Sequence, residues 1–317
     1  MKKIIIFIPA FNEENSLEKT VNSISKKINN VNEISLVLVD DCSSDKTIEI
    51  AKKLKLDFII SHDQHHGLTS MFNSMVDYFK KSDSDLMCVL DADNQYNAAD
   101  IQKLVDTHIN NKSDLVVGTR DIKHNPNMSK SKKFFQIVGS KFINLIIREK
   151  IEDVTTGFRL YTKNCFEDYF YLENDFSYTI ETLILFSWKK LKISSTNIDV
   201  NTEILRPSRL FKSNFDFIIE QSKIIIDSFN KFYPYKFFSI MAFLLLIPGL
   251  LISLRFLYFF MIGDGGHIQS LILSAILLIS TVIIFSIGIL SISMSKIRIN
   301  LEKNSKKNIK KYNIITN

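Results

Sequence analysis

Residues 86–95 read LMCVLDADNQ, an apolar run of strand length that ends at a pair of carboxylates. Asp91 and Asp93 stand two positions apart, and the carboxamide of Gln95 follows. In an open α/β sheet, ligands bind outside the carboxyl ends of the strands. Oxygen ligands that leave positions for phosphate oxygens are typical of Mg²⁺ or Mn²⁺ sites. The stretch predicts either a cation site that holds a diphosphate or simply a polar turn after a strand.

Apolar runs of strand length recur along the first part of the chain, and helical patterns separate them. These runs are residues 4–8, 34–39, 58–60, 86–90 and 115–117. Continuous apolar strands are typical of a parallel sheet that is buried on both faces. Strands that alternate with helices in this way predict an α/β fold with a doubly wound, mostly parallel sheet.

Polar clusters stand where three of these strands end. Asp40 and Asp41 follow the second strand, Asp91 and Asp93 follow the fourth, and Arg120 follows the fifth. Parallel strands bring their carboxyl ends to one edge of the sheet, where α/β proteins bind ligands. We therefore expect these side chains to share one site, although they are far apart in the sequence.

The formal net charge of the 317-residue chain is +6, and its basic excess lies in one place. The segment after Ser295 holds seven basic residues and one acidic residue, so the rest of the chain is neutral overall. A basic segment after an apolar span is typical of a cytoplasmic flank. We therefore do not expect nucleic acid as a partner.

The three cysteines form no CxxC pair and predict neither a disulfide framework nor a zinc site.

Residues 237–294 are almost continuously apolar. Because about 20 apolar residues span a bilayer core, this segment predicts two transmembrane helices joined by an extracytoplasmic turn at residues 263–267. Arg255 lies about two turns from that turn, where a long side chain can reach the membrane interface. Two crossings return the chain to its starting side. We expect a multi-pass protein of the cell (inner) membrane with its catalytic domain and both termini in the cytoplasm.

The helical pattern of residues 211–236 has two interpretations, because lysines are interspersed among its apolar positions. The helix can lie in the membrane interface or pack against the preceding domain. The predicted parts are a catalytic domain (1–210), an amphipathic juxtamembrane helix (211–236), a transmembrane hairpin (237–294) and a basic cytoplasmic tail (295–317).

Five ordered motifs resemble those of glycosyltransferase family 2. They are IPAFNEE (8–14), DDCSSD (40–45), DADNQ (91–95), GTR (118–120) and DVTTGFR (153–159). More narrowly, residues 3–210 are similar to the dolichol-phosphate mannose synthase and polyprenyl-phosphate glucosyltransferase group. The resemblance implies a GT-A fold and a UDP- or GDP-sugar donor.

On the donor side, the resemblance implies a nucleoside site in which Asp40 reads the base. The other residues that would line the nucleoside are Pro9, Ala10, Asn12 and Glu14.

The resemblance also implies a divalent cation, Mg²⁺ or Mn²⁺, on the diphosphate. Asp93 and Gln95 would hold it, and Asp91 would lie near the ribose and the metal. Guanidinium groups match phosphate oxygens, which makes three arginines candidates for diphosphate contacts: Arg120, Arg206 and Arg209. The resemblance leaves open which of the two late arginines acts.

On the acceptor side, Asp153 would orient the acceptor or act as a base. Family members often carry an arginine four residues before a serine in the helix after the fifth strand, but here Gln136 precedes Ser140. The charge for an acceptor phosphate would then come from a neighbouring lysine: Lys132, Lys133 or Lys141. A phosphate acceptor needs no strong base, whereas a hydroxyl acceptor needs proton removal in the transition state.

His62, His65 and His66 precede Gly67, and we favour a polar donor-side loop over a zinc site for them.

The predicted function is inverting transfer of a sugar from a UDP- or GDP-sugar to a polyprenyl (undecaprenyl or dolichyl) phosphate at the cytoplasmic membrane face. One alternative is transfer to a hydroxyl of a lipid-linked capsule or lipopolysaccharide glycan. Another is a non-catalytic membrane accessory protein. The sugar, the prenyl length and the oligomeric state, including a homo-oligomer, stay open.

Overall fold

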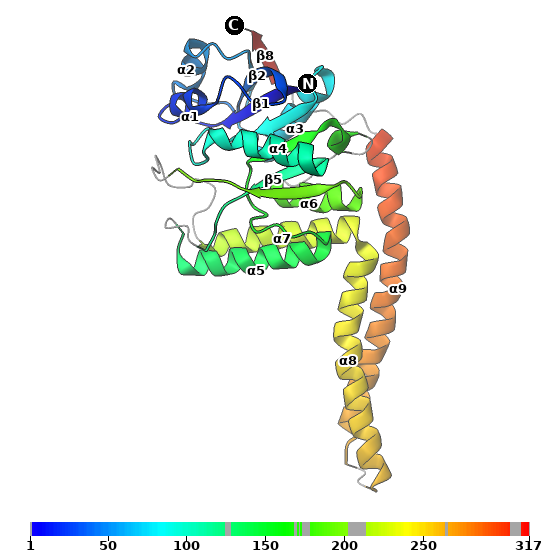
Figure 1. Ribbon diagram of the computed structural model, residues 1–317. Helices are drawn as coiled ribbons and strands as arrows, with labels where there is room; N and C mark the ends of the chain where they lie inside the picture. The colour runs from blue at the N-terminus through cyan, green and yellow to red at the C-terminus, as the bar shows by residue number, and fades with distance from the viewer. Residues whose placement is uncertain are drawn as a thin grey trace. The chain divides into compact units, whose positions relative to one another are not determined.

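The computed structural model describes residues 2–123, 128–167, 170, 172, 178–201, 214–263, 266–304 and 312–316. The chain divides into two compact units: Met1–Ile225 with Lys306–Asn317, and Ile226–Ser305. Figure 1 labels their helices and strands.

The first unit is built on an eight-stranded sheet with the strand order β7-β5-β6-β4-β1-β2-β3-β8. Its strands are β1 (Lys2–Ala10), β2 (Val31–Asp40), β3 (Phe58–His62), β4 (Leu86–Val89), β5 (Leu115–Thr119), β6 (Arg159–Thr162), β7 (Ile193–Asn197) and β8 (Tyr312–Thr316). Only β6 and β8 run antiparallel to their neighbours. The predicted α/β fold with a mostly parallel sheet is confirmed.

Helices follow most of the strands, as the alternating pattern predicts. They are α1 (Leu17–Ser23), α2 (Thr47–Lys53), α3 (Leu68–Lys81), α4 (Ile101–Asn111), α5 (Lys130–Ile147), α6 (Tyr178–Trp188) and α7 (Asn214–Phe232). Two short 3₁₀ helices cover Ala98–Asp100 and Lys163–Phe166. The side chain of Asn97 caps the first of these by accepting a hydrogen bond from the Ala99 amide at 3.1 Å.

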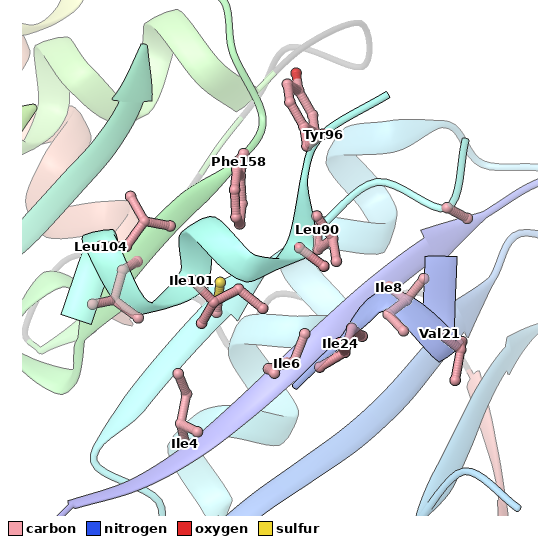
Figure 2. Close-up of a cluster of buried hydrophobic side chains, with 14 of the residues drawn as sticks. Ile4, Ile6, Ile8, Val21, Ile24, Leu90, Tyr96, Ile101, Leu104 and Phe158 are labelled. Atoms are coloured by element: carbon pink, nitrogen blue, oxygen red, sulfur yellow. The ribbon is translucent and has the colours of Figure 1, made fainter. Parts of the chain in front are cut away.

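Alternate residues of β1 enter two different apolar layers, as strand geometry requires. Ile4, Ile6 and Ile8 belong to a buried cluster that also contains residues of α1 and α4, and Figure 2 shows these side chains together. Phe7 lies in contact with Tyr78 of α3, with ring centroids 6.1 Å apart. Burial on both faces explains why β1 is apolar throughout. Each fully buried isoleucine contributes roughly 1.5–3 kcal/mol.

The second unit is a hairpin of two long helices, α8 (Pro234–Met261) and α9 (Ile268–Asn304). Both contain an 18-residue stretch that is apolar enough to cross a membrane, with mean hydropathies of 2.5 and 2.7. Glycines let the helices approach closely: a Cβ on Gly249 would lie 3.2 Å from the Leu277 Cβ, and one on Gly288 would lie 2.8 Å from the Phe238 Cβ.

The segment predicted as a basic tail differs from that prediction. Helix α9 continues to Asn304, and Tyr312–Thr316 forms strand β8, which pairs antiparallel with β3. The Tyr312 hydroxyl donates a hydrogen bond to Asp77 Oδ2 at 2.5 Å, and Ile315 packs against the main core. The chain therefore leaves the sheet domain before α8 and returns to it after α9.

Candidate active site

The predicted polar residues gather at one rim of the sheet. The strands β1, β2, β4 and β5 all end there, and Ala10 at the end of β1 is in register with Asp40 at the end of β2. Because β6 runs antiparallel, its amino end lies at the same rim. The turn at residues 153–158 therefore reaches the acidic strand ends.

Asp40 is the most distinctive residue of the donor half of this rim. Its side chain is fully buried, and Oδ2 accepts a hydrogen bond from the Ser43 amide at 3.1 Å. Among the described residues, Oδ1 has no hydrogen-bond partner. Burial raises the pKa of this carboxyl group. A buried acceptor without a donor is costly, so Asp40 is suited to receive an N–H group from a ligand.

The other predicted nucleoside residues mostly hold the neighbouring loop in place. Pro9 and Ala10 are buried at the end of β1. Asn12 has a left-handed backbone (φ 56°), and its Oδ1 accepts from the Ser44 amide at 2.8 Å. Glu14 accepts from the Lys46 amide at 3.2 Å. Asn12 and Glu14 thus join the loop after β1 to the loop after β2.

Asp41, which the sequence places at the same strand end as Asp40, is a buried hub of hydrogen bonds. Its carboxylate accepts hydrogen bonds from His62 Nδ1 at 2.7 Å and from the backbone amides of His66 and Gly67. His65 Nδ1 lies 2.8 Å from Asp41 Oδ2. Burial by itself raises the pKa of the Asp41 carboxyl group. The hydrogen bonds from the His62 ring and the two amides outweigh this effect, so the pKa is lowered overall.

This hub positions the loop of residues 62–67 beside the donor half. The His65 ring stacks on Phe11, with centroids 4.1 Å apart. Among the residues that the structure describes, no group of three or more His, Cys, Asp or Glu side chains is arranged to hold a metal. Through their contacts with Asp41, these histidines hold the loop in place.

Asp91 and Asp93 form the acidic centre of the rim. Asp93 Oδ1 accepts from the Gln95 amide at 3.0 Å. Burial, followed by the Asp93 charge, raises the pKa of Asp91 to about 7, and burial also raises the pKa of Asp93. Burial disfavours the charged forms of these two half-buried carboxylates. A divalent cation bound between them would stabilise those charged forms.

The third predicted metal ligand, Gln95, already has a hydrogen-bond partner. Gln95 Oε1 accepts a hydrogen bond from Arg120 Nη1 at 3.3 Å. The two carboxylates are therefore the better donors for a cation, while Gln95 connects them to Arg120. A glycine makes room beside them, because a Cβ on Gly157 would lie 3.2 Å from Asp91 Oδ2.

Asp153 is fully buried, and its carboxylate is saturated with hydrogen bonds. Arg120 Nε donates to Oδ2 at 2.6 Å. Oδ1 accepts from Gln136 Nε2 at 3.0 Å, from the Thr155 amide at 3.1 Å and from the Thr155 hydroxyl at 2.8 Å. Burial raises the pKa of Asp153, but the Arg120 charge and these bonds outweigh it and lower the pKa overall. This arrangement suits Asp153 for orienting Arg120 better than for removing a proton.

Helix α5 brings a row of polar side chains to the same network. Lys132, Gln136 and Ser140 are spaced four residues apart and therefore lie along one face of the helix. Gln136 Oε1 and Ser140 Oγ are buried and have no hydrogen-bond partner among the described residues. Burial, followed by the Arg120 charge, lowers the pKa of Lys132. We name these three residues the α5 row.

The other predicted basic residues are not part of this row. Lys133 Nζ donates instead to the Lys123 carbonyl at 2.9 Å. Arg206 and Arg209 lie outside the residues that the structure describes.

A mostly parallel sheet with acidic strand ends and an arginine–aspartate pair at one rim defines a GT-A-like α/β protein. The chain belongs to glycosyl transferase family 2, whose family model matches residues 5–170. The family resemblance of the motifs is therefore confirmed.

Three curated relatives illustrate this membership. The dolichol-phosphate mannosyltransferase of Pyrococcus furiosus is 33% identical over 124 residues, which cover 38% of this chain and 34% of that protein. The UDP-N-acetylglucosamine–dolichyl-phosphate N-acetylglucosaminyltransferase of Methanococcus voltae is 28% identical over 182 residues, 51% of this chain and 70% of that protein. The undecaprenyl-phosphate 4-deoxy-4-formamido-L-arabinose transferase of Proteus mirabilis is 31% identical over 157 residues, 46% of this chain and 44% of that protein. The chain thus spans about a third of the Pyrococcus protein.

Solved structures share the fold. Glucosyl-3-phosphoglycerate synthase from Mycobacterium tuberculosis, in complex with Mn²⁺, UDP and glucosyl-3-phosphoglycerate, superposes with a TM-score of 0.54. The alignment covers 72% of this chain and 79% of that chain at 17% identity. Another structure of that enzyme contains Mg²⁺ and UDP and gives a TM-score of 0.52 at 15% identity. This likeness is one of fold.

Proposed function

We propose that the protein is an inverting glycosyltransferase that moves a sugar from a UDP- or GDP-sugar to a polyprenyl phosphate at a membrane surface. The observation that carries the proposal is the bridge made by Arg120, which bonds Gln95 of the acidic motif and Asp153 of the acceptor-side motif. This bridge joins a donor half and an acceptor half at one rim. The named activities of the three relatives support the same reaction class.

In the donor half, Asp40 would recognise the base. Its unpartnered Oδ1 would accept an N–H, which both uracil and guanine offer at their imide or amide nitrogen. The neighbouring stack of Phe11 and His65 supplies an aromatic surface at the end of β1. The free energy of pairing a buried acceptor, about 1–3 kcal/mol, would favour such bases.

Asp91 and Asp93 would hold a Mg²⁺ or Mn²⁺ ion against the donor diphosphate. When bound, such an ion stabilises the negative charge that develops on the departing nucleoside diphosphate. Arg120 adds a fixed positive charge beside it, and Asp153 prevents the guanidinium from turning away.

The acceptor half suits a phosphate monoester better than a hydroxyl. An acceptor phosphate oxygen is already anionic, so it can form the bond to the sugar carbon while the bond to the diphosphate breaks, without a base. The carboxylate of Asp153, which is saturated with hydrogen bonds, agrees with a reaction that needs no base. Lys132 and Ser140 of the α5 row would bind the phosphate with Arg120.

The pairing of β8 with β3 supports the predicted topology. Both ends of the α8–α9 hairpin lead into the same folded unit, which supports an even number of membrane crossings. The use of a nucleotide-sugar donor and the basic residues near the end of α9 both favour a catalytic domain on the cytoplasmic side of the cell membrane. The orientation is part of this proposal.

One observation favours a second acceptor, the hydroxyl of a lipid-linked glycan. Gln136 is buried in the α5 row, and its Oε1 has no hydrogen-bond donor among the residues that the structure describes. A carboxamide oxygen can accept a hydrogen bond from a hydroxyl group, which an arginine cannot do.

A transfer assay tests the proposal. The full chain in lipid nanodiscs is incubated with UDP- and GDP-sugars, Mn²⁺ and undecaprenyl phosphate, and lipid-linked sugar is measured by mass spectrometry. We expect product with at least one donor and a loss of about 100-fold or more in Asp93→Ala. Asp106→Ala, a change of another half-buried aspartate on α4, is the matched control. Absence of product with every donor, or full activity of Asp93→Ala, would contradict the proposal.

A further inference from the structure

Asn201 lies in the segment after β7 and bonds the backbone of the acidic motif. Its side-chain Nδ2 donates hydrogen bonds to the carbonyl oxygens of Asn94 at 2.9 Å and of Tyr96 at 3.2 Å. Its backbone amide donates to the carbonyl oxygen of Gln95, which lies between them in the sequence, at 2.9 Å. A single residue thus holds three successive carbonyl groups of the turn that follows Asp93.

The segment that carries Asn201 is itself held in place. The Asp199 amide donates a hydrogen bond to Asp100 Oδ2 at 2.6 Å, and the Asp100 side chain is buried at the start of α4. Val200 forms an antiparallel bridge with Tyr96. Because these contacts fix the two preceding residues, the side chain of Asn201 starts from a defined position.

The turn has a second support in the hydrophobic core. Tyr96 is buried, and its ring stacks on that of Phe158 with centroids 5.4 Å apart (Figure 2). Asn94 has a left-handed backbone (φ 56°), a conformation that surrounding contacts must hold. Core packing therefore holds one end of the turn, and Asn201 holds the rest.

The turn joins the acidic centre to the arginine of the rim. The Gln95 amide donates to Asp93 Oδ1 at 3.0 Å, and Gln95 Oε1 accepts from Arg120 Nη1 at 3.3 Å. A shift of the Gln95 backbone would therefore disturb both the carboxylate and the guanidinium group. Residues that orient the ligands of a metal commonly matter almost as much as the ligands themselves.

We propose that Asn201 is a positioning residue for the cation site. It holds the turn in the shape in which Asp93 is available to a cation and Gln95 reaches Arg120. A carboxamide suits this role because its NH₂ group can donate to two carbonyl oxygens at once. The effect on the cation rests on the proposed function, whereas the hold on the turn does not.

A metal titration tests the proposal with binding as the readout. Asn201→Leu roughly keeps the size of the side chain but removes its N–H groups, and Asn201→Ala is a second variant. The full chain in nanodiscs is titrated with Mn²⁺ in the presence of UDP, and free Mn²⁺ is measured by electron paramagnetic resonance. We expect both variants to bind Mn²⁺ about tenfold or more weakly than wild type, with the affinity for UDP in the absence of metal unchanged.

The matched control for this titration is Asn111→Leu. It removes the hydrogen bond of another asparagine, from Asn111 Nδ2 to Ser194 Oγ at 3.4 Å, and should bind Mn²⁺ as wild type does. Wild-type affinity for Mn²⁺ in both Asn201 variants would overturn the proposal. Equal losses of the Mn²⁺ affinity and of the metal-free UDP affinity would also overturn it, because they would mean a general loss of structure.

Hydrogen exchange tests the hold on the turn without any metal. The amide of Gln95, which is bonded to Asp93, should exchange about tenfold faster or more in Asn201→Ala than in wild type. Unchanged exchange would overturn the hold on the turn. Failure of the proposed cation site would abolish Mn²⁺ binding by the unmodified protein and overturn the role in metal binding, while leaving the difference in exchange intact.

Discussion

Asp40 and Asp153 are both fully buried at the same rim, but their surroundings are opposite. Asp40 has an oxygen without a partner among the described residues, and its pKa is raised by burial. Asp153 is saturated by Arg120, Gln136 and Thr155, and its pKa is lowered. The first aspartate is prepared for a ligand, whereas the second serves the protein's own arginine. In the donor half of the rim, a buried acceptor is left for a ligand. In the acceptor half, the protein's own side chains already fill the hydrogen bonds of the carboxylate.

Removal of the Asp153 charge should have the largest effect on stability. In Asp153→Asn the shape is kept, but the largely buried Arg120 loses the charge of its ion-pair partner, so the free energy of unfolding should fall by about 3–5 kcal/mol. Chemical denaturation of the solubilised protein measures this change, with Asp106→Asn as the control. Unfolding of Asp153→Asn at the wild-type denaturant concentration would mean that the pair is not organised as described.

Removal of the Asp40 charge should affect binding and spare stability. Because burial disfavours the Asp40 carboxylate, Asp40→Asn should unfold at or above the wild-type denaturant concentration. Its affinity for UDP or GDP should fall about tenfold to hundredfold, because the single oxygen of a carboxamide cannot accept hydrogen bonds from both the Ser43 amide and the base. Calorimetric titration with both nucleotides measures the loss. A variant that is destabilised like Asp153→Asn but binds as wild type would reverse the comparison.

The raised pKa of Asp91, about 7, predicts how pH acts on the acidic centre. Below pH 7 a proton competes with the cation, so the apparent affinity for Mn²⁺ should fall up to about tenfold per pH unit. Without metal, the folded protein keeps a proton that the unfolded chain loses near pH 4. Its stability should therefore decrease as the pH rises from about 4 through 7.

Metal titrations and thermal unfolding at pH 5.5, 6.5 and 7.5 would measure both trends. Asp91→Asn removes the titrating group and should flatten the pH dependence of metal-free stability. A wild-type protein whose Mn²⁺ affinity is constant across this range would show that Asp91 does not bind the ion.

The smallest expected difference separates two adjacent lysines of α5. Lys132 lies in the α5 row near Arg120, whereas Lys133 bonds the Lys123 carbonyl. Lys132→Ala should raise the KM for a lipid phosphate acceptor about fivefold, because one partly exposed, charge-assisted hydrogen bond is lost. Lys133→Ala should change it less than about twofold. Equal effects of the two substitutions would remove the α5 row from the acceptor site.

The sequence predicts most of the sheet, because strands that are buried on both faces must be apolar along their whole length. It also predicts that Asp40, Asp91 and Arg120 lie at one rim, because a parallel sheet brings strand ends to the same edge. It misses β8, since Tyr312–Thr316 is short and its partner β3 lies far back in the sequence.

The state of each site residue is harder to predict than its position. Nothing local indicates that the Asp153 carboxylate is saturated, because Arg120 and Gln136 come from other elements. The hub at Asp41 is hidden for the same reason. The adjacent aspartates Asp40 and Asp41 look equivalent in the sequence, but only Asp41 meets the loop that follows β3.

A competition between acceptors tests the central claim most directly. Nanodiscs that contain the full chain receive equal amounts of undecaprenyl phosphate and of a lipid-linked glycan with free hydroxyls, together with Mn²⁺ and the nucleotide sugars. We predict that the transferred sugar is found on the prenyl phosphate, with inverted anomeric configuration. Transfer to the glycan alone would contradict the account and would favour the hydroxyl acceptor that Gln136 can bind.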